Sequence, residues 1–198
     1  LYNEMTAQEL KAEQKILEKR YNDFKAKGLK LDMSRGKPGK DQLDLSSAMN
    51  DVKNYVSDGF DVRNYGLMDG IPSCKKLFAD LMGVQSENVI VGPNASLTLM
   101  FDYISQCFTH GAGDIPWCKL DEVKFLCPVP GYDRHFTIIE HFGIKMINIA
   151  MKADGPDMDA IEEYIRDESV KGMICVPKYS NPQGITFSDA VVKRIAAM

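Results

Sequence analysis

The sequence predicts an α/β fold in which helices cover both faces of a mostly parallel sheet, preceded by a separate helical segment. From residue 88 onward, apolar segments of strand length alternate with helical segments. The strand segments are apolar throughout, which is typical of strands that are buried on both faces. Alternation of this kind favours parallel strands joined by covering helices.

An amphipathic helix is predicted between Thr6 and Gly28. Thr6 and Glu9 form a capping-box pattern, and Gly28 is a C-terminal stop signal. Residues 34–40 form a loop with glycine, proline and three cations, which is either a solvated basic turn or an anion-binding edge of a site. Further helices are predicted at residues 46–58 and from Pro72 to Gly83.

The elements after residue 88 follow in alternation. Strands are predicted at residues 88–91, 123–127, 144–149 and 170–176, and helices at residues 95–108, 132–142, 157–166 and from Ser188 onward. The apolar periodicity of the last helix is still running at Met198, without a C-terminal signal. We therefore expect the chain to be the N-terminal portion of a longer protein, and a complete small domain with a frayed end is the alternative.

Composition and charge argue against several kinds of partner. The 198 residues include 24 basic and 28 acidic side chains, with a formal net charge of -4 and no basic stripe, so neither nucleic acid nor a membrane surface is expected. No apolar run is long enough to span a bilayer. The five cysteines are odd in number and widely spaced, as reduced thiols are, which indicates a cytoplasmic location. The histidines fall in no metal-ligand pattern, so no metal is expected.

Asn181 is the first candidate site residue. It follows the apolar run 172–177, within Lys178-Tyr179-Ser180-Asn181-Pro182-Gln183-Gly184. This places it just past the carboxyl end of a buried strand, where open α/β sheets bind their ligands. Pro182 disfavours the α region for Asn181, so the amide is presented from an extended backbone. An ordinary Asn-Pro turn is the alternative.

Two further strand ends offer ligand-binding groups. Gly92-Pro93-Asn94-Ala95-Ser96-Leu97 leads into a helix whose first amide groups suit a phosphate, with Asn94 acting only as a helix cap as the alternative. Pro130-Gly131-Tyr132 offers an aromatic face to a flat ligand, unless Tyr132 packs on its own helix. A phosphate cradle, a stacking ring and an amide donor are together what pyridoxal phosphate (PLP) needs.

The order of these motifs resembles the N-terminal half of the class I and II aminotransferases, which are PLP enzymes of fold type I. Tyr65-Gly66 with Gly70 comes first, and the three strand-end motifs follow. The amino-acid sequences of Ser34-Arg35-Gly36-Lys37-Pro38 and of the segment around Asn181 are similar to those of a bacterial branch of the aspartate aminotransferases. The resemblance implies a small-domain helix and a substrate-side loop in residues 1–45, and an incomplete PLP-binding major domain in residues 46–198.

The resemblance also implies roles for single residues. Asn181 hydrogen-bonds the phenolic oxygen of the cofactor and helps to seat the substrate carboxylate, while Tyr132 stacks on the pyridine ring. The turn Asn94-Ala95-Ser96 holds the phosphate. Tyr65 reaches the phosphate of the neighbouring subunit, in a homodimer with shared active sites, and Gly36 lies against the substrate.

The implied reaction transfers the amino group of an acidic amino acid, aspartate, to a 2-oxo acid such as 2-oxoglutarate. The family's cofactor-binding lysine, the aspartate that faces the pyridine nitrogen and the arginine that grips the substrate carboxylate all lie later than Met198. We therefore expect no catalytic residue in this chain and no transamination by this chain alone. The alternatives are a PLP-dependent lyase or decarboxylase of the same fold, and a non-catalytic effector-binding domain of a transcription regulator.

Overall fold

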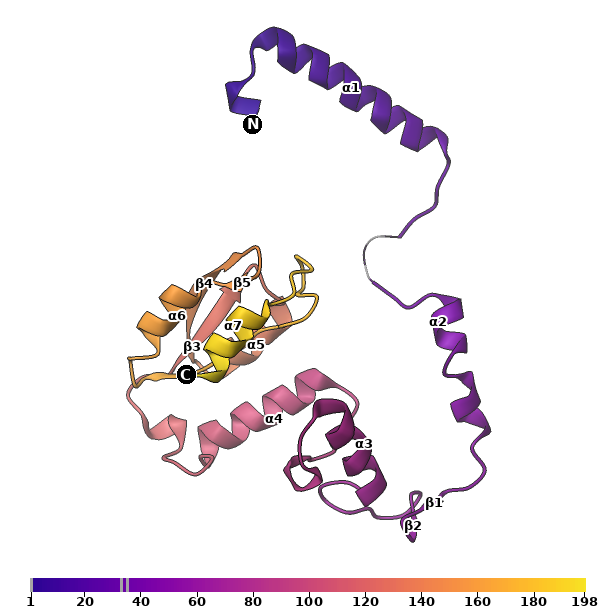
Figure 1. The fold of residues 1–198 in the computed structure, drawn as a ribbon, viewed down its shortest axis with the longest axis vertical. Helices are drawn as coiled ribbons and strands as arrows, with labels where there is room; N and C mark the ends of the chain where they lie inside the picture. Colours follow the sequence, from indigo (N-terminus) through magenta and orange to yellow (C-terminus); the bar gives the residue numbers. More distant parts are fainter. Residues whose placement is uncertain (1, 33, 35) are drawn as a thin grey trace. The chain divides into compact units, whose positions relative to one another are not determined.

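The computed structural model describes residues 2–32, 34 and 36–198. The chain divides into two compact units, Leu1–Val56 and Ser57–Met198 (Figure 1). The predicted division after residue 45 separates two functional segments and stays a prediction.

Helix α1 (Ala7–Ala26) is the longest element of the first unit. Its predicted capping box is confirmed: Thr6 N–H donates to Glu9 Oε2 at 2.8 Å, and Glu9 N–H donates to Thr6 Oγ1 at 3.3 Å. The other elements are the 3-10 helix η1 (Tyr2–Glu4), helix α2 (Lys40–Asp44) and the 3-10 helix η2 (Ser47–Asp51). No described residue of this unit is buried, so the apolar core lies in the second unit.

The helix predicted at residues 46–58 is wrong beyond Asp51. Helix η2 ends there, and Val52 is extended with φ -62° and ψ 118°. The side-chain oxygen of Asn54 accepts a hydrogen bond from Val56 N–H at 3.1 Å, and such a local turn competes with helical backbone bonds. The two-residue strands β1 (Val56–Ser57) and β2 (Phe60–Asp61) follow and form a small sheet of their own.

Helix α3 (Pro72–Met82) begins and ends as predicted. Pro72 lies in the first turn, where a backbone N–H would have no helical acceptor. Gly83 ends the helix in the left-handed conformation, with φ 70° and ψ 34°. The Asp58 carboxylate accepts a hydrogen bond from Ser73 N–H at 2.8 Å, so the turn between β1 and β2 caps this helix.

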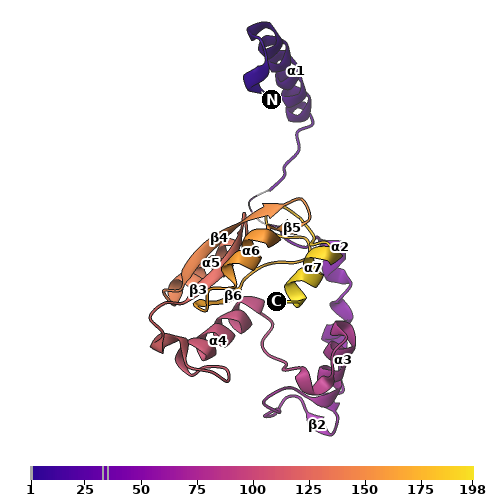
Figure 2. The same cartoon turned by 60° about the vertical axis from the view of Figure 1, so that its left-hand side comes forward.

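The main sheet has the strand order β5-β4-β3-β6 (Figure 2). Strand β3 (Lys124–Val129) is parallel to β4 (Lys145–Lys152) on one side and to β6 (Val170–Met173) on the other. Strand β5 (Gly155–Pro156) pairs antiparallel with the end of β4. Because β3, β4 and β6 run in the same direction, their carboxyl ends lie along one edge of the sheet.

Helices pack on both faces of this sheet, which confirms the predicted fold class. Phe125 and Cys127 of β3 belong to a core cluster with α4 (Ser96–Thr109), the 3-10 helix η4 (Trp117–Lys119) and α5 (Asp133–His141). Leu126, which lies between them, belongs to a second cluster with α6 (Met158–Tyr164) and α7 (Asp189–Ala196). Successive side chains of β3 therefore enter opposite layers of the fold.

The burial of β3 also changes the acidity of the Cys127 thiol. Cys127 is 1% exposed, and this burial raises the pKa of its thiol to about 11. All five cysteines are unpaired. Within the described ranges, no helix combines the length and the apolar character that crossing a membrane requires.

The strand predicted at residues 88–91 is wrong. The 3-10 helix η3 (Ser86–Asn88) occupies its start, and Val89 to Val91 pair with no strand of the described chain. Val89 is extended and only 4% exposed, so the apolar pattern predicts its burial correctly. A strand also needs a neighbouring strand for its backbone bonds, and the main sheet provides none at this position.

Replacement of Leu126 tests the role of β3 at the centre of the core. Leu126→Ala is expected to lower the free energy of unfolding by about 2–5 kcal/mol, because it empties space between β3 and the helices that cover it. Urea denaturation measures the difference. Val192→Ala, at a position of α7 that is 47% exposed, is the control and should change the same quantity by less than about 0.5 kcal/mol. Equal losses in the two variants would contradict the central position of Leu126.

Candidate active site

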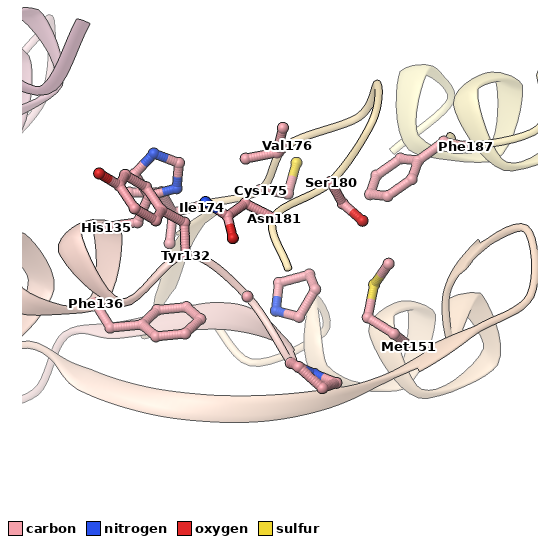
Figure 3. A pocket seen from close by; sticks show the side chains of 13 residues that line it. Tyr132, His135, Phe136, Met151, Ile174, Cys175, Val176, Ser180, Asn181 and Phe187 are labelled. Atoms are coloured by element: carbon pink, nitrogen blue, oxygen red, sulfur yellow. The ribbon is translucent and has the colours of Figure 1, made fainter. Parts of the chain in front are cut away.

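A cleft, called here the strand-end cleft, lies at the carboxyl ends of β3 and β6. Figure 3 shows the rings of Tyr132 and His135 on one side of it, Phe187 and Met151 on the other, and Asn181 between them. Its lining residues are Pro128, Pro130, Gly131, Tyr132, His135, Phe136, Met151, Ile174, Cys175, Val176, Ser180, Asn181 and Phe187. The structure therefore brings two predicted site residues, Tyr132 and Asn181, to one place.

The strand-end cleft is narrow. Its cavity volume is about 20 Å³, which is room for roughly one water molecule. A flat heteroaromatic ring is larger than this, so the part of the cleft that such a ligand could use is the surface at its mouth. Tyr132 is half-buried there and Asn181 is exposed.

A tight turn after β3 sets the position of Tyr132. A Cβ atom on Gly131 would lie 2.6 Å from the carbonyl oxygen of Pro128 and 2.6 Å from Cζ of Phe136, so only glycine fits in this turn. Tyr132 then caps helix α5, because its carbonyl oxygen accepts a hydrogen bond from His135 N–H at 3.0 Å. The backbone on both sides of Tyr132 is thus held in place by local contacts.

His135 packs against Tyr132. The two ring centroids are 5.1 Å apart and the ring planes meet at 81°, an edge-to-face arrangement. His135 is 5% exposed, and burial lowers the pKa of its imidazole. The ring is therefore uncharged at neutral pH and supports Tyr132 as an aromatic neighbour.

The loop that carries Asn181 is closed by hydrogen bonds. Phe187 N–H donates to Pro177 O at 2.8 Å, and Ser180 N–H donates to Ile185 O at 2.8 Å. Two side chains add to these bonds: Ile185 N–H donates to Ser180 Oγ at 3.0 Å, and Tyr179 N–H donates to Thr186 Oγ1 at 3.1 Å. The Asn181 side chain has no hydrogen-bond partner within the described ranges, so its amide is available to a ligand.

The predicted phosphate turn precedes α4. The N-cap of this helix is Ala95, with no side-chain capping bond, so the alternative in which Asn94 caps the helix is wrong. The amides of the first turn of an uncapped helix are free to bind an anion, and Asn94 and Ser96 are both exposed. They line a separate cavity of about 370 Å³, with Phe78, Met82 and Leu99 among its walls. The structure does not bring this turn into the strand-end cleft.

The loop that carries Tyr65 is bound to the segment before the phosphate turn. Val91 N–H donates to Asp69 O at 3.0 Å. Gly70 has φ +103°, and a Cβ atom there would lie 2.7 Å from Cβ of Val91, so glycine permits this close approach. Asp69 also forms an ion pair with Lys75. Tyr65 itself is 100% exposed, and its ring is free to meet another chain.

Gly36 lies in the first unit and is exposed. A Cβ atom on it would have no neighbour within 4 Å among the described atoms. Arg35, which belongs to the same motif, lies outside the described residues. The substrate-side role of Gly36 stays a prediction.

The lining of the strand-end cleft includes two buried polar residues that the sequence does not mark as site residues, His135 and Ser180. His135 follows Tyr132 at i+3 on one helix face, and this spacing, which brings side chains together, is the sequence signal for its position. Ser180 directly precedes Asn181, but its role depends on its bond to Ile185, which local sequence patterns do not reveal.

Comparison with known proteins gives close matches over nearly the whole chain. A family model described as aspartate amino-transferase matches residues 5–198. The aspartate aminotransferase of Corynebacterium glutamicum is 47% identical over 190 residues, which cover 92% of this chain and 44% of that protein. A putative aminotransferase of Mycolicibacterium smegmatis is 44% identical over 199 residues, 96% of this chain and 46% of that protein.

Comparison with solved structures also finds an aspartate transaminase. The crystal structure of an aspartate transaminase from Corynebacterium glutamicum superposes with a TM-score of 0.84 at 44% identity, over 98% of this chain and 47% of that one. The architecture is that of the fold type I aminotransferases, of which it forms part of a domain. This chain belongs to the aspartate aminotransferase family, and it spans about half the length of the curated relatives it matches.

Proposed function

We propose that this chain is the N-terminal part of a PLP-dependent aminotransferase. Its substrates are an acidic amino acid, aspartate, and a 2-oxo acid such as 2-oxoglutarate. The observation that carries the proposal is the meeting of an aromatic face, Tyr132, and the Asn181 amide, which has no hydrogen-bond partner among the described residues, where β3 and β6 end. Membership of the aspartate aminotransferase family supports it.

Two residues of the strand-end cleft fit the ring of PLP. Its flat ring requires an aromatic face, and Tyr132 is half-buried with one side supported by His135. Its phenolic oxygen requires a donor, and the Asn181 amide has none of its hydrogen bonds satisfied by the described residues. Its phosphate requires N–H groups, which the uncapped start of α4 offers at a turn that lies outside the strand-end cleft. When bound, PLP supplies an electrophilic carbon and an electron-withdrawing ring for amino-group chemistry.

Each residue has a distinct part in this proposal. Tyr132 binds one face of the cofactor ring. Asn181 donates a hydrogen bond to the phenolic oxygen, which favours the ionised form of that oxygen, and it seats the substrate carboxylate. Asn94-Ala95-Ser96 binds the phosphate, and Gly36 lies against the substrate.

The lysine that bonds the cofactor belongs, in this proposal, to the part of the protein after Met198. None of the described lysines lines the strand-end cleft. A PLP-dependent lyase or decarboxylase of the same fold would present the same cleft, but two relatives at 47% and 44% identity are described as aminotransferases. The unpaired cysteines support a cytoplasmic location.

The active protein is, in this proposal, a homodimer whose two sites are shared. The exposed ring of Tyr65 supports this arrangement, because a fully exposed side chain on an anchored loop is free to enter a neighbouring subunit. A two-fold interface would create the two sites reciprocally.

Replacement of Asn181 tests its bond to the cofactor. In the full-length protein, Asn181→Ala should leave PLP bound but raise the spectroscopic pKa of the bound cofactor by about one unit, because a donor to the ionised oxygen is lost. Absorbance titration against pH measures this value. Gln183→Ala, at an exposed position of the same loop, should leave it unchanged. A titration curve of Asn181→Ala identical to that of the wild type would refute the contact.

Two replacements of Tyr132 separate its ring from its hydroxyl. Tyr132→Ala should raise the dissociation constant of PLP about 2- to 10-fold, because stacking contributes about 0.5–1.5 kcal/mol beyond burial. Tyr132→Phe keeps the ring and should bind PLP as the wild type does. Fluorescence titration of the apoprotein gives both constants. If the two variants were damaged equally, the hydroxyl and not the ring would be the binding group.

Mixed dimers test whether Tyr65 acts across the interface. Tyr65→Phe should loosen PLP without unfolding the protein, because a hydrogen bond to a phosphate oxygen contributes about 1.5–3 kcal/mol. Subunits with only Tyr65→Phe are mixed with subunits in which only the cofactor-bonding lysine is replaced. If Tyr65 acts in the neighbouring subunit, one site of each hybrid has both defects and the other has neither, so wild-type affinity and activity return at that site.

A role of Tyr65 in its own subunit would give a different PLP affinity in the mixed dimers. If Tyr65 serves its own subunit, every site with an intact lysine keeps the weakened PLP binding of the Tyr65→Phe parent. In that case no hybrid regains wild-type affinity, and the shared-site arrangement is excluded.

A further inference from the structure

Asn181 is held in place by hydrogen bonds that its neighbour Ser180 forms. Asn181 is exposed and its side chain has no partner within the described ranges, so its position depends on the backbone. Ser180 forms three bonds to the returning chain. Ser180 N–H donates to Ile185 O at 2.8 Å, Gly184 N–H donates to Ser180 O at 2.5 Å, and Ile185 N–H donates to Ser180 Oγ at 3.0 Å.

The third of these bonds uses a buried side chain. Ser180 is 8% exposed, and Ile185, whose N–H it accepts, is half-buried. Water has little access at this point, so loss of the hydroxyl would leave the Ile185 N–H without an equivalent partner. The bond therefore keeps the two sides of the loop together.

The returning side of the loop is fixed in the core. Phe187 is 5% exposed and packs in the cluster that contains Leu126 and Val191. Its N–H donates to Pro177 O at 2.8 Å, on the outgoing side of the loop. Through Ile185, the Ser180 hydroxyl links the exposed Asn181 to this rigid part of the fold.

We propose that Ser180 is a positioning residue of the cofactor site. Its hydroxyl does not contact the ligand. It accepts the Ile185 N–H and so holds the loop in the conformation that presents the Asn181 amide at the mouth of the strand-end cleft. This inference rests on the proposed function, because it requires that Asn181 binds the cofactor.

The test compares single and double variants of the full-length protein with PLP bound. Ser180→Ala should raise the spectroscopic pKa of the cofactor in the same direction as Asn181→Ala, by a smaller amount. It should also raise the dissociation constant of PLP by about 3- to 10-fold, the effect of one lost hydrogen bond. Because Ser180 acts through Asn181, the double variant Ser180→Ala/Asn181→Ala should show the same pKa as Asn181→Ala alone.

Ser188→Ala is the matched control. Ser188 Oγ likewise accepts a backbone N–H, that of Val191 at 3.3 Å, and it caps helix α7. Because Ser188 Oγ also donates to Asp154 Oδ2 at 3.0 Å, its loss should lower the melting temperature at least as much as Ser180→Ala does, but leave the spectroscopic pKa and the PLP affinity unchanged. If Ser180→Ala does not fold, Ser180→Cys takes its place, because the thiol keeps the volume and is a weaker acceptor.

The possible outcomes separate the inference from the function on which it rests. A Ser180 variant that lowers the melting temperature without moving the spectroscopic pKa, while Asn181→Ala moves it, overturns the positioning role alone. Additive shifts in the double variant also overturn it, because Ser180 would then act independently of Asn181. If the wild-type protein does not bind PLP, or Asn181→Ala does not move the pKa, the proposed function fails first.

Discussion

The parallel pairing of β3 with both β4 and β6 is the constraint on which the rest of the structure depends. Continuous registers join Lys124–Val129 to Lys145–Ala150 on one side, and β6 pairs on the other with a single shift near Lys124. Because β3 presents apolar side chains on both of its faces, its successive residues pack against two separate helical layers and hold them together. The same pairing sends the chain out of β3 and β6 at one edge, so Tyr132 and Asn181 meet although they are distant in the sequence.

Tyr132 and Asn181 are held in position at this edge of the sheet by two different kinds of interaction. At Tyr132, steric fit dominates: Gly131 lets the turn approach Pro128 and Phe136, and His135 supports the ring from one side. At Asn181, hydrogen bonds dominate, since backbone and hydroxyl groups close the loop while the side-chain amide forms no hydrogen bond with any residue that the structure describes. In both cases the binding group itself makes few contacts and its neighbours fix it. Preorganisation of this kind reduces the entropy lost when a ligand binds.

The sequence predicts most features that depend on adjacent residues, such as helix caps, and only some of those that depend on contacts between distant segments. The strands at β3, β4 and β6 are recognisable from apolar segments, although β6 ends at Met173, three residues before the predicted end at residue 176. The caps at Thr6, Pro72 and Gly83 depend on a few adjacent residues. Residues 88–91 carry the same apolar signal but lack a strand beside them, because pairing depends on distant segments. Tyr132 and Asn181 are predictable as strand-end residues, whereas the bond between Ser180 and Ile185 depends on how the loop returns.

The high pKa of the Cys127 thiol makes this residue an internal reporter of the strand that carries the site. With a pKa of about 11, roughly one thiol in 10⁴ is ionised at pH 7, and the thiolate is the form that alkylating reagents attack. Because Cys127 is also only 1% exposed, its modification requires β3 to separate from the layers that bury it. Cys118 is exposed, and it provides in the same chain the reference rate of a thiol that reagents reach without any opening.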